Sequence, residues 1–122
     1  MKYLLDSNII IYLSKETLPI EKVFQNSCEY FISIITFMEV LGHSFVSEVE
    51  EEKVKSLISK LNIIYVDQPI ALEVVQIRKD KKMKLPDAII AATAIVKNMS
   101  LMTYNIDDFK NIEKLQIINP ED

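Results

Sequence analysis

Acidic residues at the ends of apolar segments are the side chains of this sequence best suited to chemistry. Asp6 follows a short apolar run, Asp87 opens the almost wholly apolar segment Leu85–Ala94, and Glu39 stands in an equivalent place between them. Carboxylates that converge repel one another, and a divalent cation with oxygen ligands removes that penalty. The pattern therefore predicts a site for Mg²⁺ or Mn²⁺, which suit carboxylate ligands in the absence of thiolate and imidazole.

Each of these acids also has a purely structural interpretation. Asp6, or Asn8 two residues later, is a good cap for a following helix. The spacing Thr36-x-x-Glu39 fits a capping box, in which the glutamate bonds back to the cap residue. Asp87 lies near the positive end of its helix, which predicts a lowered pKa and an ionised carboxylate at neutral pH.

The residues that are scarce exclude other chemistries. One cysteine, Cys28, allows no internal disulfide, and one histidine, His43, leaves little room for a Ser-His-Asp relay or a histidine-rich zinc site. One glycine, Gly42, excludes the Gly-rich phosphate loops. The net charge of −4 gives no global basic field, so any binding of nucleic acid has to be local.

One local basic cluster precedes the Asp87 segment. The residues from Arg78 to Lys84 include five positive charges in seven positions. We expect Lys81, Lys82 and Lys84 to position the phosphates of a bound nucleic acid without reading its sequence. The alternative is a solvated helix end, where cations are favoured by the helix dipole.

The elements that must position these residues alternate between strands and helices. Most expected strands are continuous apolar runs, which is typical of a parallel sheet covered by helices on both faces. We therefore expect one α/β domain over residues 1–122, a three-layer α/β/α sandwich with about five parallel strands. The expected strands are Tyr3–Leu5, Tyr30–Ile34, Ile63–Val66, Ser100–Thr103 and Leu115–Ile118. The expected helices are Ile9–Leu13, Ile20–Asn26, Thr36 to Phe45, Glu50–Leu61, Pro69 to Asp80 with Asp67 as its cap, Pro86 to Asn98, and Ile106–Phe109.

In such sheets, ligands bind beyond the carboxyl ends of the strands, near the point where the strand order reverses. Asp6, Thr103 and the turn after Ser33 all follow expected strands, and Glu39 and Asp87 lie in the opening turns of helices. The chain order therefore predicts that these side chains gather at one edge of the sheet.

Four segments together resemble the PIN-domain proteins, and most closely the VapC-type toxin ribonucleases. They are Asp6-Ser7-Asn8 after the first strand, Ser33–Glu39, Leu85–Ala94, and Leu101–Phe109, in that order along the chain. The closing residues Ile117–Pro120 resemble that family as well, so the resemblance covers essentially the whole chain.

The resemblance implies Asp6 and Asp87 as principal metal ligands and Glu39 as a third acidic ligand, bound directly or through water. It implies that Asn8 and Thr103 support these acids by orienting them.

The fourth acidic position departs from the family pattern. Many relatives carry an acid two residues after the threonine, where this chain has Asn105. An asparagine can accept a hydrogen bond or coordinate through its carbonyl oxygen, but it brings no charge. We expect Asp108 to supply the missing carboxylate, with Asp107 as the alternative.

The resemblance implies a metal-dependent ribonuclease that hydrolyses RNA phosphodiester bonds with Mg²⁺ or Mn²⁺. It also implies a homodimer and a cognate antitoxin protein. Two other functions stay open: a PIN-like binding or scaffold module without catalysis, and a phosphatase of the haloacid dehalogenase type, which also begins with a strand and an Asp. No apolar run reaches the length of a membrane span, and the charged N-terminus is unlike a signal peptide. We therefore expect a cytoplasmic protein with no membrane partner.

Overall fold

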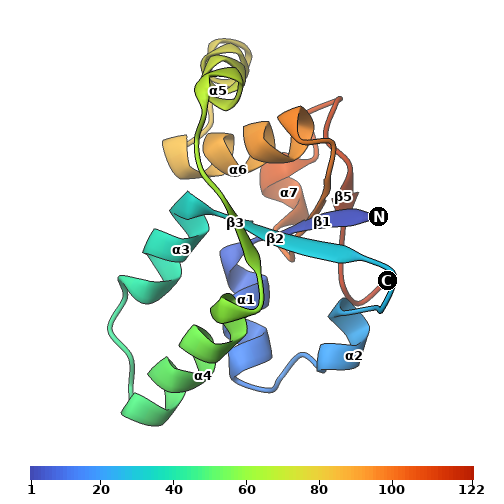
Figure 1. The fold of residues 1–122 in the computed structure, drawn as a ribbon. Coiled ribbons are helices and arrows are strands. Elements are labelled where there is room, and N and C mark those ends of the chain that lie inside the picture. The colour runs from blue at the N-terminus through green and yellow to red at the C-terminus, as the bar shows by residue number, and fades with distance from the viewer.

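The computed structural model describes residues 1–122 and consists of a parallel five-stranded sheet between two layers of helices (Figure 1). The strands are β1 (Lys2–Leu5), β2 (Glu29–Ser33), β3 (Asn62–Ile64), β4 (Ser100–Met102) and β5 (Ile117–Ile118). The helices are α1 (Ser7–Ser14), α2 (Ile20–Val23), α3 (Ile34–Leu41), α4 (Glu48–Ser59), α5 (Gln68–Asp80), α6 (Leu85–Val96) and α7 (Ile106–Phe109). The three-layer α/β/α architecture expected from the sequence is confirmed.

The strand order is β3-β2-β1-β4-β5, and every neighbouring pair is parallel. The chain therefore builds outward from β1 in one direction and then returns to the other side of β1 through β4. This reversal lies between β1 and β4, where Leu5 pairs with Met102 at the last position of both strands. A crevice beyond the carboxyl ends of the two strands is the usual place for a ligand in such a sheet.

A separate apolar core covers each face of the sheet. Alternate residues of a strand point to opposite faces, so Leu4 and Leu101 belong to the core beneath α5, α6 and α7, while Leu5 and Met102 belong to the core against α1 to α4. Figure 1 shows α5 and α6 on one side of the sheet and α1, α2 and α4 on the other.

The helix that carries Asp87 is buried, as its composition predicts. In α6 the residues from Ala88 to Ala94 other than Ile89 are buried, mostly alanines that allow close packing on the sheet. Pro86 lies in its first turn, where a missing N–H leaves no bond unmade. The expected cap of α5 is also confirmed, because Asp67 Oδ1 accepts a hydrogen bond from Ile70 N–H.

The predicted start of α3 is wrong. The helix begins at Ile34 and is capped by Ser33, whose Oγ accepts from Ile35 N–H at 3.1 Å. Thr36 is therefore inside the helix, so no capping box joins it to Glu39. The Thr36 hydroxyl is fully buried and has no hydrogen-bond partner.

The predicted ends of α3 and α4 also shift. The helix α3 ends at Leu41 rather than Phe45, because Gly42 forms its C-cap. The next helix begins at Glu48, two residues earlier than expected, because Ser47 Oγ accepts from Glu50 N–H. None of the helices is long and apolar enough to cross a membrane.

Candidate active site

Asp6 is the buried acid at the reversal of the strand order. Only 4% of its surface is exposed, and its backbone N–H donates to Met102 O, which joins the ends of β1 and β4. Its Oδ1 accepts from Ser7 N–H at 2.8 Å, which caps α1. Its Oδ2 accepts from the Thr103 hydroxyl at 2.8 Å. Asp6 therefore does cap α1, as the structural interpretation of the sequence predicts, but the cap uses only one of its two carboxylate oxygens.

The Thr103 hydroxyl has its proton fixed by its surroundings. Its oxygen accepts from Asn8 Nδ2 at 3.3 Å and from Asn105 N–H at 3.0 Å. A hydroxyl has one proton and two acceptor positions. Because both acceptor positions are occupied, the proton is directed to Asp6, and this favours an ionised Asp6 carboxylate.

Asn8 completes the polar cluster around Asp6. Its Nδ2 donates to Asp6 Oδ2 at 3.4 Å, and its Oδ1 accepts from Tyr104 N–H at 3.2 Å. The Tyr104 N–H contact fixes which side of the amide is oxygen, because a backbone N–H can only donate. Asn8 and Thr103 therefore orient the Asp6 carboxylate, as the sequence predicts for supporting residues.

The four acids repel one another across this edge of the sheet. Burial raises the pKa of Asp6 above 3.8, in opposition to its three hydrogen bonds, and the charge of Asp108 raises it further. The exposed Glu39 has a pKa raised by partial loss of hydration and by the charges of Asp6 and Asp87. Four carboxylates from β1, α3, α6 and α7 thus influence one another, although they are far apart in sequence.

The predicted pKa of Asp87 is wrong in direction. Partial burial, followed by repulsion from Asp6 and then Asp108, raises it above 3.8, and Lys84 opposes this only in part. The dipole of α6 favours the charged form, but neighbouring carboxylates and desolvation outweigh that contribution. The cluster therefore carries an excess of negative charge that a cation would stabilise.

The candidates for the fourth acidic position have different surroundings. Asp108 influences the pKa of both Asp6 and Asp87. Asp107 points into solvent and pairs with Lys110 at 3.0 Å. Asn105 is exposed, and it supports the cluster through its backbone N–H on Thr103 rather than through its amide.

The carboxylate side chains have the right chemistry to bind a hard cation, but their oxygens do not converge on one point. All the candidate ligands offer carboxylate oxygens, which Mg²⁺ and Mn²⁺ prefer. No three acidic, histidine or cysteine side chains lie in an arrangement that could hold a metal ion as they stand.

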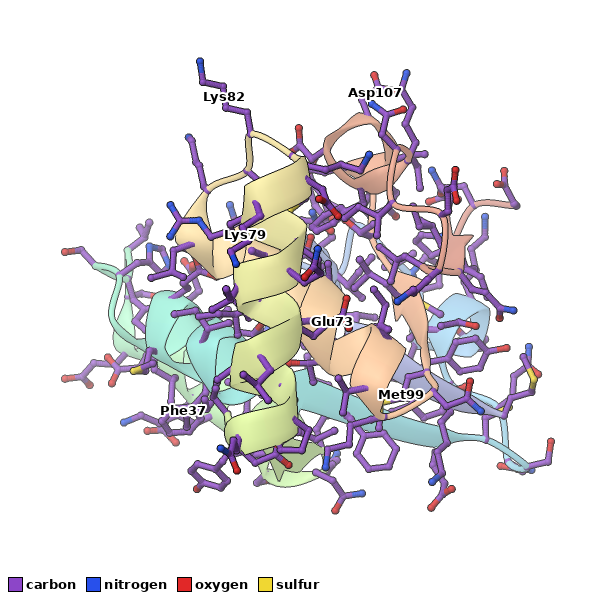
Figure 2. The ribbon with its side chains drawn as sticks, turned by 90° about the horizontal axis from the view of Figure 1, so that it is seen from above. Phe37, Glu73, Lys79, Lys82, Met99 and Asp107 are labelled. Carbon is purple, nitrogen blue, oxygen red and sulfur yellow. The ribbon has the colours of Figure 1, made fainter.

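The lysine cluster borders the acids. Lys84, the N-cap residue of α6, lowers the pKa of Asp87 and so lies within reach of its charge. A cavity of about 560 Å³ is lined by Lys81 and Lys82 and by the acids Asp80, Asp107 and Asp108. Figure 2 shows Lys82 and Asp107 projecting at the same end of the molecule.

Some contacts of the site have no signal in the sequence. The backbone N–H of Tyr104 donates to Asn8 Oδ1, and any residue type provides such a donor. Only the strand–turn–helix geometry at each position predicts contacts of this kind.

The comparisons with known proteins agree with one another. A family model described as the PIN domain matches residues 3–115. Ribonuclease VapC1 of Haemophilus influenzae strain R2866 is 33% identical over 95% of this chain and 96% of that protein. The structure of VapBC2 from Rickettsia felis, bound to a DNA fragment from their promoter, is similar with a TM-score of 0.85 and 26% identity over 98% of both chains. VapBC-1 from nontypeable Haemophilus influenzae has a TM-score of 0.81 and 28% identity over 100% of both chains.

Proposed function

Because this chain belongs to the PIN domain family, among the VapC ribonucleases, we propose that it is a metal-dependent endoribonuclease and the toxin of a toxin–antitoxin pair. The observation that carries the proposal is the position of Asp6. This buried carboxylate is oriented by hydrogen bonds at the reversal of the strand order, and it lies within the electrostatic reach of three other acids.

Asp6 and Asp87 would hold the cation, with Glu39 as a third ligand, direct or through water. When bound, Mg²⁺ or Mn²⁺ supplies activation of water and neutralises charge on the scissile phosphodiester. Thr103 and Asn8 keep the Asp6 carboxylate in one orientation. Asp108 would take the fourth position, because its charge raises the pKa of both Asp6 and Asp87.

Lys81, Lys82 and Lys84 offset the negative charge of this edge for an RNA strand. Phosphate contacts of this kind fix the position of the backbone and carry no sequence information. Lys81 and Lys82 line the same cavity as Asp108, which supports a strand with its phosphates toward these lysines.

An RNA cleavage assay with Mg²⁺ or Mn²⁺ tests the proposal. We expect cleavage by the wild-type protein and a loss of at least about 100-fold in Asp6→Asn and Asp87→Asn, because a ligand is removed. Glu113→Gln, an exposed acid on the α7–β5 connection, is the matched control and should cleave like the wild type. Equal cleavage by all four proteins would contradict the proposed site.

The other two functions are less well supported. A binding module without catalysis would bind RNA and leave it intact with every cation, which the same assay measures. A phosphatase of the haloacid dehalogenase type needs a second Asp where this chain has Asn8, and the Asn8 amide is already bonded to Asp6, Thr103 and Tyr104.

A groove on the opposite side of the sheet fits the proposed antitoxin. The end of α1, the start of α2 and one face of α4 line a cavity of about 590 Å³, with Leu13, Leu18 and Leu57 among its walls. A similar structure from Klebsiella pneumoniae, with a TM-score of 0.76 and 34% identity over 97% of both chains, is a toxin–antitoxin complex by its title, which supports a partner of the same kind. Leu57→Glu should abolish association with the cognate antitoxin, while Glu113→Gln should leave it unchanged.

The outer face of α5 supports the proposed homodimer. Leu72 and Val75 lie three residues apart on this face and are exposed, and the exposed Tyr65 and Val66 precede the helix. Light scattering should give the mass of a dimer for the wild type and of a monomer for Leu72→Lys combined with Val75→Lys. A cytoplasmic location is part of the same proposal, because both RNA and a newly made antitoxin are present there.

A further inference from the structure

A chain of contacts leads from the acidic site to the last residues of the protein. Asn8, which binds Asp6 and Thr103, is itself bound by the backbone N–H of Tyr104. Tyr104 directly follows Thr103. The position of this one residue therefore affects both side chains that donate to Asp6 Oδ2.

The Tyr104 side chain is held at two points. Its ring contacts the Tyr12 ring edge-on, with 5.1 Å between the centroids and 87° between the planes. Tyr12 lies one turn after Asn8 on α1, so the same face of α1 holds both the backbone and the ring of Tyr104. The Tyr104 hydroxyl donates to Glu121 Oε2 at 2.9 Å.

Glu121 is in turn fixed by two further contacts. Its Oε1 pairs with Lys22 Nζ at 2.8 Å, and its backbone N–H donates to Asn119 Oδ1 at 2.9 Å. Figure 1 shows the C-terminus beside α2, which carries Lys22. Burial, together with the neighbouring carboxylate of Glu121, raises the pKa of Tyr104 to about 12, so the hydroxyl keeps its proton and donates it.

We propose that Glu121 and Tyr104 are positioning residues for the Asp6 site. The Glu121–Tyr104 contact holds the residues after β4 against α1, and it thereby keeps Thr103 and Asn8 at hydrogen-bond distance from Asp6. The inference rests on the proposed function only in that Asp6 is taken as a ligand of the cation. The contact between Glu121 and Tyr104 is partly open to solvent, so it contributes little to the free energy of unfolding. Its main effect is on the geometry at Asp6.

A double-mutant cycle on the full chain tests this inference. Tyr104→Phe keeps the ring against Tyr12 and removes the hydroxyl, and Glu121→Ala removes its acceptor. We expect each variant to weaken Mn²⁺ binding by about 3-fold to 10-fold, as measured by electron paramagnetic resonance. This loss is smaller than the roughly 10-fold to 100-fold that is typical when a residue hydrogen-bonded directly to a metal-ligating side chain is changed. The double variant should be no weaker than either single variant, because both changes remove the same contact.

Two variants separate a positioning role from a merely structural one. Glu121→Gln retains an oxygen that accepts from Tyr104, so it should bind Mn²⁺ nearly as the wild type does. Asp122→Asn, at the neighbouring exposed acid, is the matched control and should change nothing. Variants with lowered melting temperatures and unchanged Mn²⁺ affinity would overturn the inference, because the contact would then serve the fold alone.

A second measurement is independent of any cation. The side-chain amide protons of Asn8, followed by ¹⁵N NMR, should exchange with solvent faster in Tyr104→Phe and Glu121→Ala than in the wild type. If the wild type binds no Mn²⁺, the proposed function fails, and the Asn8 amide still decides the positioning role. Unchanged exchange in both variants would overturn it.

Discussion

At the scale of single residues, two buried threonines have opposite surroundings. Thr103 and Thr36 are both fully buried. The Thr103 hydroxyl donates to Asp6 and accepts from two N–H donors, whereas the Thr36 hydroxyl has no partner. A buried hydroxyl costs free energy unless it is bonded, and a bond to a carboxylate is worth more than one between neutral groups.

The same substitution at these two positions should therefore have opposite effects. Thr103→Val should lower the free energy of unfolding by about 2 kcal/mol and reduce RNA cleavage, because Asp6 loses its shortest side-chain donor. Thr36→Val should raise the free energy of unfolding by about 1 kcal/mol, because an unpaired buried hydroxyl is replaced by a methyl group of similar shape. Urea unfolding measures both, and a loss of stability in Thr36→Val would show that its hydroxyl has a partner such as a bound water.

At this scale the sequence identifies acids that influence one another in the structure, but it misjudges their electrostatics. Asp6, Glu39 and Asp87 gather at one edge because the βα units place them there. The pKa of Asp87 depends on burial and on Asp108, neither of which is visible in the local sequence. The partner of Tyr104, Glu121, is 17 residues away and has no motif around it.

At the scale of elements, the ends of helices explain most differences from the prediction. Ser33 and Thr36 are both suitable caps, and only the end of β2 decides that Ser33 is used.

Two helices end in a left-handed residue other than glycine. Glu16 follows α1 with φ of 62°, and Asn98 follows α6 with φ of 57°. In both, the hydrogen bonds are those of a Schellman motif.

Glycine at these two positions should have unequal effects. Glu16→Gly should raise the free energy of unfolding by about 1 kcal/mol, because a side chain with a Cβ is strained at positive φ. The substitution removes only an exposed ion pair between Glu16 and Lys53 at 3.5 Å, and such a pair contributes little to stability. Asn98→Gly is the control and should gain less, since asparagine tolerates this conformation. A loss of stability in Glu16→Gly by thermal unfolding would contradict this account of the turn.

The segment that joins α5 to α6 is the element expected to hold RNA. Lys81 is the C-cap residue of α5 and Lys84 the N-cap residue of α6, so the alternative of cations at a negative helix end applies to Lys81. Arg78 donates to Met83 O at 3.3 Å and so holds the loop rather than pointing freely into solvent.

Neutralising this segment should distinguish the two interpretations. The variant with Lys81, Lys82 and Lys84 all changed to Gln should bind single-stranded RNA more weakly. The plot of the logarithm of the association constant against the logarithm of the salt concentration should also become less steep, by about 2. The reason is that each phosphate contact to a single strand releases about 0.7 counterions. Changing Lys53 and Lys55 on α4 and Lys60 at its C-cap to Gln removes the same charge from another part of the molecule and should leave the slope unchanged. Equal slopes for both triple variants would favour the solvated helix end.

At the scale of the whole molecule, the mutual repulsion of the acidic cluster reduces the stability of the fold at neutral pH. Asp6, Glu39 and Asp87 all have pKa values raised in the folded protein. At a pH above 3.8 the folded protein retains protons that the unfolded chain has released. Stability from these groups is therefore fully present at low pH and is lost as the pH rises through their folded pKa values. Asp67 and Glu121, whose pKa values are lowered, act in the opposite direction.

A comparison of two proteins isolates the contribution of Asp87. Without divalent cations, Asp87→Asn should be more stable than the wild type at neutral pH, because the repulsion from Asp6 and Asp108 is removed. The difference should decrease as the pH falls through the raised pKa of Asp87, where the wild-type carboxyl takes up a proton. Urea unfolding across this range measures it. A variant that is less stable than the wild type at neutral pH would show that Asp87 stabilises the fold.

The order of the strands is what the apolar pattern alone does not specify. Alternating strands and helices predict a parallel sheet with two covered faces, and the structure confirms it. The same pattern is compatible with several strand orders, and the observed one places the ends of β1 and β4 side by side. Asp6 and Thr103 come into contact for that reason, although 97 positions separate them.

An anomalous difference map from crystals of the wild-type protein soaked in Mn²⁺ tests the central claim most directly. We predict one strong peak at the carboxyl edge of the sheet, within ligand distance of Asp6 and Asp87, with the Glu39 side chain turned toward it. No such peak should occur in crystals of Asp6→Asn. A map without density between Asp6 and Asp87, at a Mn²⁺ concentration that supports RNA cleavage, would contradict the claim that these acids share a cation.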